Sequence, residues 1–151
     1  MGIEKTIVMI KPEGIEHKDF IHHRLSQHGL LLSQRKTVVL SQVMIDGLYP
    51  DLPPAIKKAT LEHLKGKEVE VLLIQGENAI RTVMGEVGEH KIPANCDVGS
   101  IRSVLADKTT DKGEIVVRIT ERLSYHKNFV HRANGPEEVE LQAKLFGLSL
   151  K

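Results

Sequence analysis

The order of apolar and polar residues divides the chain into short strands and helices. Runs rich in aliphatic and β-branched residues predict strands over residues 5–10, 30–40 and 69–74. Apolar residues repeated at helical spacing predict helices over residues 18–28, 54–64 and 80–87, and a last helix that begins at residues 134–138. Ser41 is expected to cap a further helix that follows it, and Gly88 is expected to end the helix over residues 80–87.

This order of elements predicts an α+β fold, with an antiparallel sheet covered by helices. It is compatible with a ferredoxin-like βαββαβ core. Because we find no internal repeat and no Ser/Gly linker, we expect residues 1–151 to form a single domain. Residues 103–127 do not fit this core. A polar turn at 107–113 and a strand-like run at 114–120 predict an insertion, as a hairpin that touches another subunit.

Composition narrows the class of protein. The formal net charge of +1 argues against an extended nucleic-acid surface, and no apolar run reaches the length of a membrane span. Cys96 is the only cysteine, which excludes an intramolecular disulfide and a thiol-rich metal site. A strand-like run begins near the first residue and leaves no room for a leader. We therefore expect a soluble cytoplasmic protein that binds neither nucleic acid nor membranes.

Candidate phosphate-binding residues are scattered along the chain. There is no glycine-rich phosphate loop, so side chains would have to bind any phosphate. Lys11 follows the first strand beside a Pro-Glu-Gly turn, Arg102 ends the run Val-Gly-Ser-Ile, and Asn128 and His131 precede the last helix. Taken singly, each has an ordinary interpretation as a solvated or structural residue. The 8 histidines show no zinc-ligand spacing, so we expect no metal site.

Five segments, taken together and in order, resemble the nucleoside diphosphate kinase family over nearly the whole chain. They are the strand and turn at 6–14, the strand-to-helix junction at 75–80, the loop at 93–102, the Asn-x-x-His run at 128–131 and the final helix at 136–146. No single segment is decisive, but their order and spacing make the resemblance specific.

The resemblance implies an enzyme with a ping-pong reaction. His131 would accept the γ-phosphate of a nucleoside triphosphate as phosphohistidine and pass it to a nucleoside diphosphate. Lys11, Arg102 and a Mg²⁺ carried by the nucleotide would neutralise the moving phosphoryl group. Asn128 would hydrogen-bond the sugar or phosphate, and Tyr49 would line the pocket. The resemblance also implies a homo-oligomer, a hexamer or a tetramer.

The sequence departs from the family pattern at several positions. The second phosphate-binding arginine of the family falls on Met84, and Arg81 is a candidate substitute for it. The phosphate-binding threonine is replaced by His90 or Lys91, and the base-stacking phenylalanine by Ile56. Near the nucleophile, a serine is replaced by Ala133, and the glutamate that contacts the imidazole is replaced by Gln142. Each well-placed electrostatic contact is worth roughly 10²–10³ in turnover. We therefore expect the fold and the nucleophile to be kept and the rate to be reduced.

Two other functions fit parts of this pattern. A diverged member with little or no kinase activity could act as a nucleotide-binding or protein-interaction module, and a plain ferredoxin-like interaction module could match by chance. We favour the enzyme, because a module without catalysis would not need Lys11, Arg102, Asn128 and His131 together.

Overall fold

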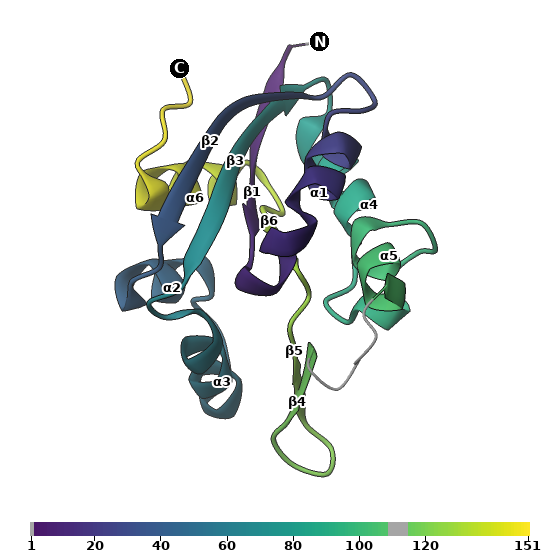
Figure 1. The fold of residues 1–151 in the computed structure, drawn as a ribbon. Coiled ribbons are helices and arrows are strands. Elements are labelled where there is room, and N and C mark those ends of the chain that lie inside the picture. The colour runs from purple at the N-terminus through teal and green to yellow at the C-terminus, as the bar shows by residue number, and fades with distance from the viewer. Residues whose placement is uncertain (1, 109–114) are drawn as a thin grey trace.

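A four-stranded antiparallel sheet forms the centre of the computed structural model, which describes residues 2–108 and 115–151. Its strands are β1 (Glu4–Ile10), β2 (Leu31–Val39), β3 (Glu68–Gly76) and β6 (Val130–Arg132), in the order β2-β3-β1-β6 (Figure 1). The central pair β1 and β3 is in register from Glu4↔Gly76 to Ile10↔Glu70. The short strand β6 pairs with β1 and lies at the edge.

Helices connect these strands in the predicted order. They are α1 (Lys18–Leu25), α2 (Gln42–Leu48), α3 (Pro54–Leu64), α4 (Ala79–Val87), α5 (Ile101–Lys108) and α6 (Pro136–Phe146), with 3-10 turns at Pro12–His17 and Pro93–Asn95. The succession β1-α1-β2-β3-α4-β6 is the βαββαβ unit, so the predicted ferredoxin-like fold is confirmed.

Both faces of the central strands β1 and β3 are buried. In β1, Val8 and Ile10 face a core built with α1, α4 and α5, while Ile7 and Met9 face a second core built mainly with α2 and α6. Figure 1 shows these two groups of helices on opposite sides of the sheet. Since neighbouring residues of a strand point to opposite faces, an unbroken apolar run such as β1 is what a doubly covered strand requires.

One helix was not predicted. Residues 103–108, taken from sequence as the start of an irregular insertion, belong to α5, whose Leu105 and Ala106 are buried in the first core. The helix has 8 residues, about two turns, which is too short for its periodicity to stand out from the surrounding polar residues. The sequence interpretation of 103–108 was therefore wrong.

The predicted hairpin follows this helix. It consists of β4 (Val116–Arg118) and β5 (Ser124–His126), which pair with Val117 opposite Tyr125. The strand is shorter than the predicted 114–120. Residues 109–114, with most of the predicted polar turn, lie outside the described residues.

The element ends agree with the sequence to within a few residues. Helix α1 ends at Leu25 rather than at residue 28, because His28 and Gly29 take positive φ angles of 59° and 77° in the turn into β2. Ser41 caps α2 as predicted, since its Oγ accepts a hydrogen bond from Met44 N at 3.2 Å. In the described part of the chain, no helix has both the length and the apolar character that crossing a membrane requires.

Candidate active site

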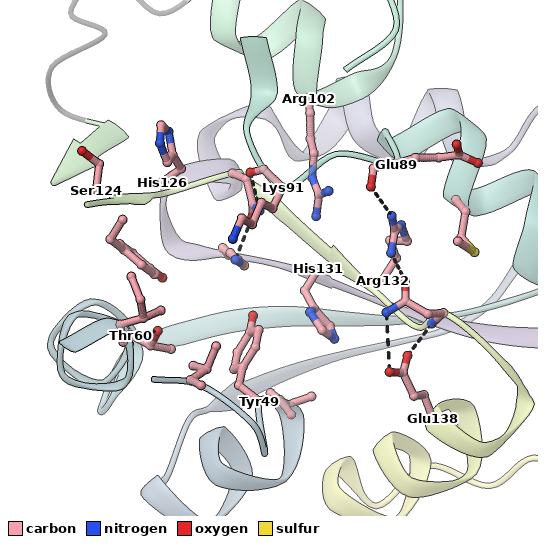
Figure 2. A pocket seen from close by; sticks show the side chains of 18 residues that line it. Tyr49, Thr60, Glu89, Lys91, Arg102, Ser124, His126, His131, Arg132 and Glu138 are labelled. Carbon is pink, nitrogen blue, oxygen red and sulfur yellow. Dashed lines mark hydrogen bonds between the residues drawn. The ribbon is translucent and has the colours of Figure 1, made fainter. Parts of the chain in front are cut away.

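A cavity of about 540 Å³ lies beside β6 and the end of β1. Figure 2 shows its side chains, which come from the end of β1, α2, α3, α4 and the loop after it, α5, β5, β6 and α6. It is lined by Lys11, Leu48, Tyr49, Leu52, Ile56, Thr60, Met84, Glu89, Lys91, Arg102, Ser124, Tyr125, His126, Asn128, His131, Arg132, Asn134 and Glu138. All five predicted site residues, Lys11, Tyr49, Arg102, Asn128 and His131, are in this set. The volume falls within the range of small-molecule sites.

His131 lies in the middle of this cavity. It sits in β6 opposite Met9 of β1, and its ring meets that of Tyr49 edge to face, with centroids 5.1 Å apart. Burial lowers the pKa of His131 to about 3, and the positive charges of Lys11 and Arg102 act in the same direction. The imidazole is therefore neutral at pH 7, the form in which a ring nitrogen has a lone pair for attack.

Gln142 contacts this imidazole from α6. An amide atom of Gln142 lies 3.1 Å from His131 Nε2, and Gln142 is 2% exposed. The amide can donate to a bare Nε2 or accept from a protonated one, because its oxygen and nitrogen can exchange places. In the second arrangement Nδ1 keeps its lone pair and is the nitrogen available as a nucleophile.

Lys11 and Asn128 form the next part of the wall. Lys11 Nζ donates to Asn128 Oδ1 at 2.7 Å and lies 5.6 Å from the centre of the Tyr49 ring. Asn128 Nδ2 in turn donates to the carbonyl of Lys91 at 3.0 Å. Burial lowers the pKa of Lys11 to about 8, with the attraction of Glu13 opposing and the repulsion of Arg102 adding to this shift. Lys11 is thus predominantly charged at pH 7.

The Pro-Glu-Gly turn after Lys11 holds the backbone in front of the histidine. Phe129 takes a φ of 70°, which is uncommon for a residue with a side chain. Its carbonyl accepts from Lys11 N at 2.9 Å, and its N–H donates to Glu13 Oε2 at 3.1 Å. A Cβ on Gly14 would lie 2.5 Å from Phe129 O, so this close approach requires glycine.

Arg102 enters the cavity from α5, the helix that was not predicted. Its guanidinium donates to three carbonyl oxygens: Gly88 at 3.1 Å, His90 at 3.0 Å and Val130 at 2.7 Å. Burial lowers the pKa of Arg102 to about 10, with repulsion by Arg132 as the next cause, so the group stays charged at pH 7.

Arg132 also lines the cavity, and sequence reasoning missed it. It donates to the carbonyls of Gly88 and Glu89, both at 3.2 Å, and to Asn134 Oδ1. The only signal in the sequence was its position directly after His131. Because neighbouring strand residues point to opposite faces, that position alone does not predict a shared site. The long side chain and the edge position of β6 nevertheless bring it to the same cavity.

Some of the residues that replace family site residues line the cavity, and others do not. Ile56 and Met84 line the cavity, and Met84 is also packed against the second core. Arg81 is exposed and lies outside the cavity lining, so it does not substitute for the arginine expected at Met84. Of the pair His90 and Lys91, only Lys91 lines the cavity.

A chain of three side chains links the hairpin to the turn after β1. Tyr125 Oη lies 2.8 Å from His63 Nδ1, and His63 Nε2 lies 2.7 Å from Glu13 Oε1. Burial alone would raise the pKa of Glu13, but the hydrogen bond with His63 and the charge of Lys11 hold it below its ordinary value. An ionised Glu13 accepts from His63 Nε2, which leaves Nδ1 to accept the Tyr125 hydroxyl.

The charge of the cavity suits an anion. The positive charges of Lys11, Arg102 and Arg132 all act on the neutral His131. Glu89 and Glu138 also line the cavity. Within residues 2–108 and 115–151, no group of three or more His, Cys, Asp or Glu side chains is arranged to hold a metal ion. The arrangement can bind a polyphosphate next to a nucleophilic imidazole.

Comparisons with known proteins identify the family of this chain. A family model described as nucleoside diphosphate kinase matches residues 4–147. The nucleoside diphosphate kinase of Archaeoglobus fulgidus is 26% identical over 147 residues, covering 95% of this chain and 86% of that protein. The enzyme of Metallosphaera sedula is 24% identical over 149 residues, covering 97% and 94%.

Solved structures share the fold. A transition-state mimic of the nucleoside diphosphate kinase of Borrelia burgdorferi, with bound vanadate and ADP, superposes with a TM-score of 0.74 at 16% identity, covering 95% of this chain and 86% of that one. The nucleoside diphosphate kinase of Pyrobaculum aerophilum gives a TM-score of 0.72 at 21% identity, covering 96% of both chains. The resemblance predicted from the sequence is therefore confirmed: this chain belongs to the nucleoside diphosphate kinase family, the enzyme class that its sequence indicated.

Proposed function

We propose that the protein transfers the terminal phosphoryl group of a nucleoside triphosphate to a nucleoside diphosphate, with His131 as the phosphorylated nucleophile. The observation that carries this proposal is the neutral, half-buried imidazole of His131, which lines one cavity with the charged Lys11 and Arg102. A histidine kept neutral by its surroundings, and bordered by cations, meets the needs of phosphoryl transfer better than those of a structural role.

In the first half-reaction, Nδ1 of His131 attacks the terminal phosphorus. The nitrogen–phosphorus bond forms while the bond from phosphorus to the bridging oxygen breaks, and the electron pair leaves with the nucleoside diphosphate. With its amide oxygen turned toward the ring, Gln142 accepts a hydrogen bond from the Nε2–H group and so keeps the attacking tautomer in place. In the second half-reaction, a terminal oxygen of another diphosphate attacks the phosphohistidine, and the imidazole is released.

Lys11 and Arg102 stabilise the charge that spreads over the equatorial oxygens during transfer. Both are fixed before substrate binds, Lys11 by Asn128 and Arg102 by three carbonyl groups, so little reorganisation is needed when the charge develops. Mg²⁺ is part of the substrate in this scheme, carried by the phosphates of the nucleotide. Tyr49 packs against the His131 ring and closes that side of the cavity.

We further propose a cytoplasmic homo-oligomer, a hexamer or a tetramer, as the resemblance implies. The edge strand β2 supports a contact between subunits, because Leu31 and Val39 are 56% and 57% exposed there and Val43 of α2 is 74% exposed. Light scattering on the purified protein measures the number of subunits. A monomer at micromolar concentration would contradict this part of the proposal.

A transfer assay tests the proposed reaction. The protein is mixed with γ-labelled ATP, Mg²⁺ and unlabelled GDP, and the formation of labelled GTP is followed at several concentrations of both nucleotides. We expect the parallel double-reciprocal lines of a ping-pong reaction. Binding of both nucleotides without transfer would contradict the proposal and favour a nucleotide-binding or protein-interaction module.

A further inference from the structure

The guanidinium of Arg132 is a buried charge of the cavity to which the proposed reaction assigns no role. Arg132 is 8% exposed and follows directly on His131. Its two terminal nitrogens donate to Gly88 O, Glu89 O and Asn134 Oδ1. Its Nε atom is buried and has no hydrogen-bond partner among the described residues. The same is true of Nε of Arg102, so two guanidinium groups at the cavity keep a donor unused.

The two arginines also repel each other. Their guanidinium groups donate to the same oxygen, Gly88 O, and this proximity helps to lower the pKa of Arg102. Glu89 and Glu138 attract Arg132, but neither forms an ion pair with it in the described part of the chain. Two buried cations without a paired anion cost free energy, and such an arrangement is typical of a site that binds an anion.

Helix α4, whose C-cap Gly88 accepts a hydrogen bond from Arg132, contributes no cation to the cavity lining. Helix α4 presents Met84 to the cavity, and its Arg81 is exposed elsewhere. Figure 2 shows Arg132 beside His131, on the side away from Thr60 and Ser124. A phosphoryl group bound at His131 would therefore meet Arg132 from β6 and Arg102 from α5.

We propose that Arg132 is a phosphate-binding residue of this site. Together with Arg102 it binds the transferred phosphoryl group, a role for which helix α4 offers only the apolar Met84. This inference rests on the proposed function. Its alternative is a purely structural role, in which Arg132 only ties the loop at Gly88 to the start of α6.

Binding of tripolyphosphate, which has the phosphates of the substrate but no nucleoside, separates these roles without measuring activity. Calorimetric titration compares wild type with Arg132→Gln and with the matched control Arg122→Gln, whose side chain is exposed on the hairpin. Loss of one charge-assisted contact is expected to weaken binding about 10- to 100-fold for Arg132→Gln. Arg122→Gln should bind as wild type does. Equal binding by wild type and Arg132→Gln would overturn the proposal.

A rescue variant adds a readout that a structural role would not move. In the Arg132→Gln background, Met84→Arg returns a guanidinium to the cavity from α4 without restoring the contacts of Arg132 to Gly88 and Glu89. We expect it to recover about tenfold in tripolyphosphate affinity. A double variant that is folded, as judged by circular dichroism, and binds no better than Arg132→Gln contradicts the proposal.

If Arg132→Gln does not fold, the tripolyphosphate affinity of Arg132→Lys distinguishes phosphate binding from a purely structural role. Lysine keeps the charge as a point but cannot make the forked contacts to two carbonyls. A folded Arg132→Lys within about threefold of wild type in tripolyphosphate affinity supports phosphate binding. A tenfold or larger loss overturns it.

Phosphorylation of His131 is scored separately, so the two proposals can fail independently. If wild type takes no label from ATP but Arg132→Gln loses tripolyphosphate, the kinase proposal fails and the phosphate site stands. If wild type is labelled and Arg132→Gln binds and transfers as well as wild type, only the role of Arg132 falls.

Discussion

Arg102 and Arg132 share one acceptor: both guanidinium groups donate to the carbonyl oxygen of Gly88, at 3.1 and 3.2 Å. Gly88 has a φ of 120°, and a Cβ there would lie 2.7 Å from Cys96 Sγ. Glycine is therefore required at the point where both arginines are held. The glycine that ends α4 in the sequence also places two cations beside the histidine.

This cluster of cations predicts stabilisation by a bare polyphosphate. An anion that binds only the folded protein adds about 2.7 kcal/mol at 100 times its dissociation constant. We expect tripolyphosphate to raise the melting temperature of wild type by several degrees, and much less in Arg102→Gln. An equal rise in both proteins would mean that the anion binds elsewhere.

The lowered pKa of Lys11 predicts that kcat/KM falls at alkaline pH. Its pKa is lowered to about 8 by burial, so its charge is present below that pH and is lost as the pH rises through it. Since kcat/KM reports on the free enzyme, it should fall above about pH 8. Lys11→Gln should show a lower kcat/KM, by about 10²-fold, without this alkaline limb. A wild-type profile that stays flat to about pH 9.5, where the proton concentration is roughly thirtyfold below the value that half-protonates Lys11, would contradict this assignment.

The contact between Gln142 and His131 predicts that the residue at position 142 affects the pKa of the His131 imidazole. Next to a neutral amide, His131 keeps its pKa near 3 and should not titrate between pH 5 and 8 in NMR spectra of the imidazole protons. Gln142→Glu places a carboxylate beside the ring, and an opposite charge at this distance raises a histidine pKa by about 1–3 units. The same spectra test this, with His126→Gln used to assign the second imidazole of the cavity. An unchanged His131 signal in Gln142→Glu would show that position 142 does not act on the nucleophile.

The hydrogen bonds of His63 with Glu13 and Tyr125 are expected to stabilise the folded protein. His63→Leu removes the hydrogen-bond donor to Glu13 Oε1 and the acceptor of the Tyr125 hydroxyl, and leaves Tyr125 buried and Glu13 half-buried without these partners. We expect the free energy of unfolding to fall by about 2–4 kcal/mol in urea denaturation. The matched change His23→Leu, on the exposed side of α1, should stay within about 0.5 kcal/mol of wild type. Equal effects of the two changes would argue against the Glu13–His63–Tyr125 chain.

The sequence predicted the parts of the fold that long periodic patterns encode. The apolar run of β1 and the helical face of α4 are such patterns, and the structure confirms both. Helix α5 escaped because its buried residues, Leu105 and Ala106, are few and lie within a polar segment. Its first residues nevertheless carry Arg102, so the predicted site residue was found without the helix that holds it.

The candidate site shows the same division. Their order in the chain led to the prediction of five site residues, and all five line one cavity: Lys11, Tyr49, Arg102, Asn128 and His131. Contacts that depend on tertiary packing were not accessible to sequence reasoning. Glu13 and His63 are 50 residues apart, and their hydrogen bond depends on how α3 packs near the turn after β1. Arg132 was missed because alternation along a strand argues against its sharing a site with its neighbour.

Direct trapping of the phosphorylated protein tests the central claim. Wild type, His131→Ala and His126→Ala are incubated with γ-labelled ATP and Mg²⁺, freed of nucleotide, and mapped by peptide mass spectrometry before and after GDP is added. We predict an acid-labile phosphoryl group on His131 in wild type and in His126→Ala, lost on addition of GDP with formation of labelled GTP, and no such label in His131→Ala. Equal labelling of His131→Ala, or no label on wild type, would contradict the assignment of His131 as the phosphate carrier.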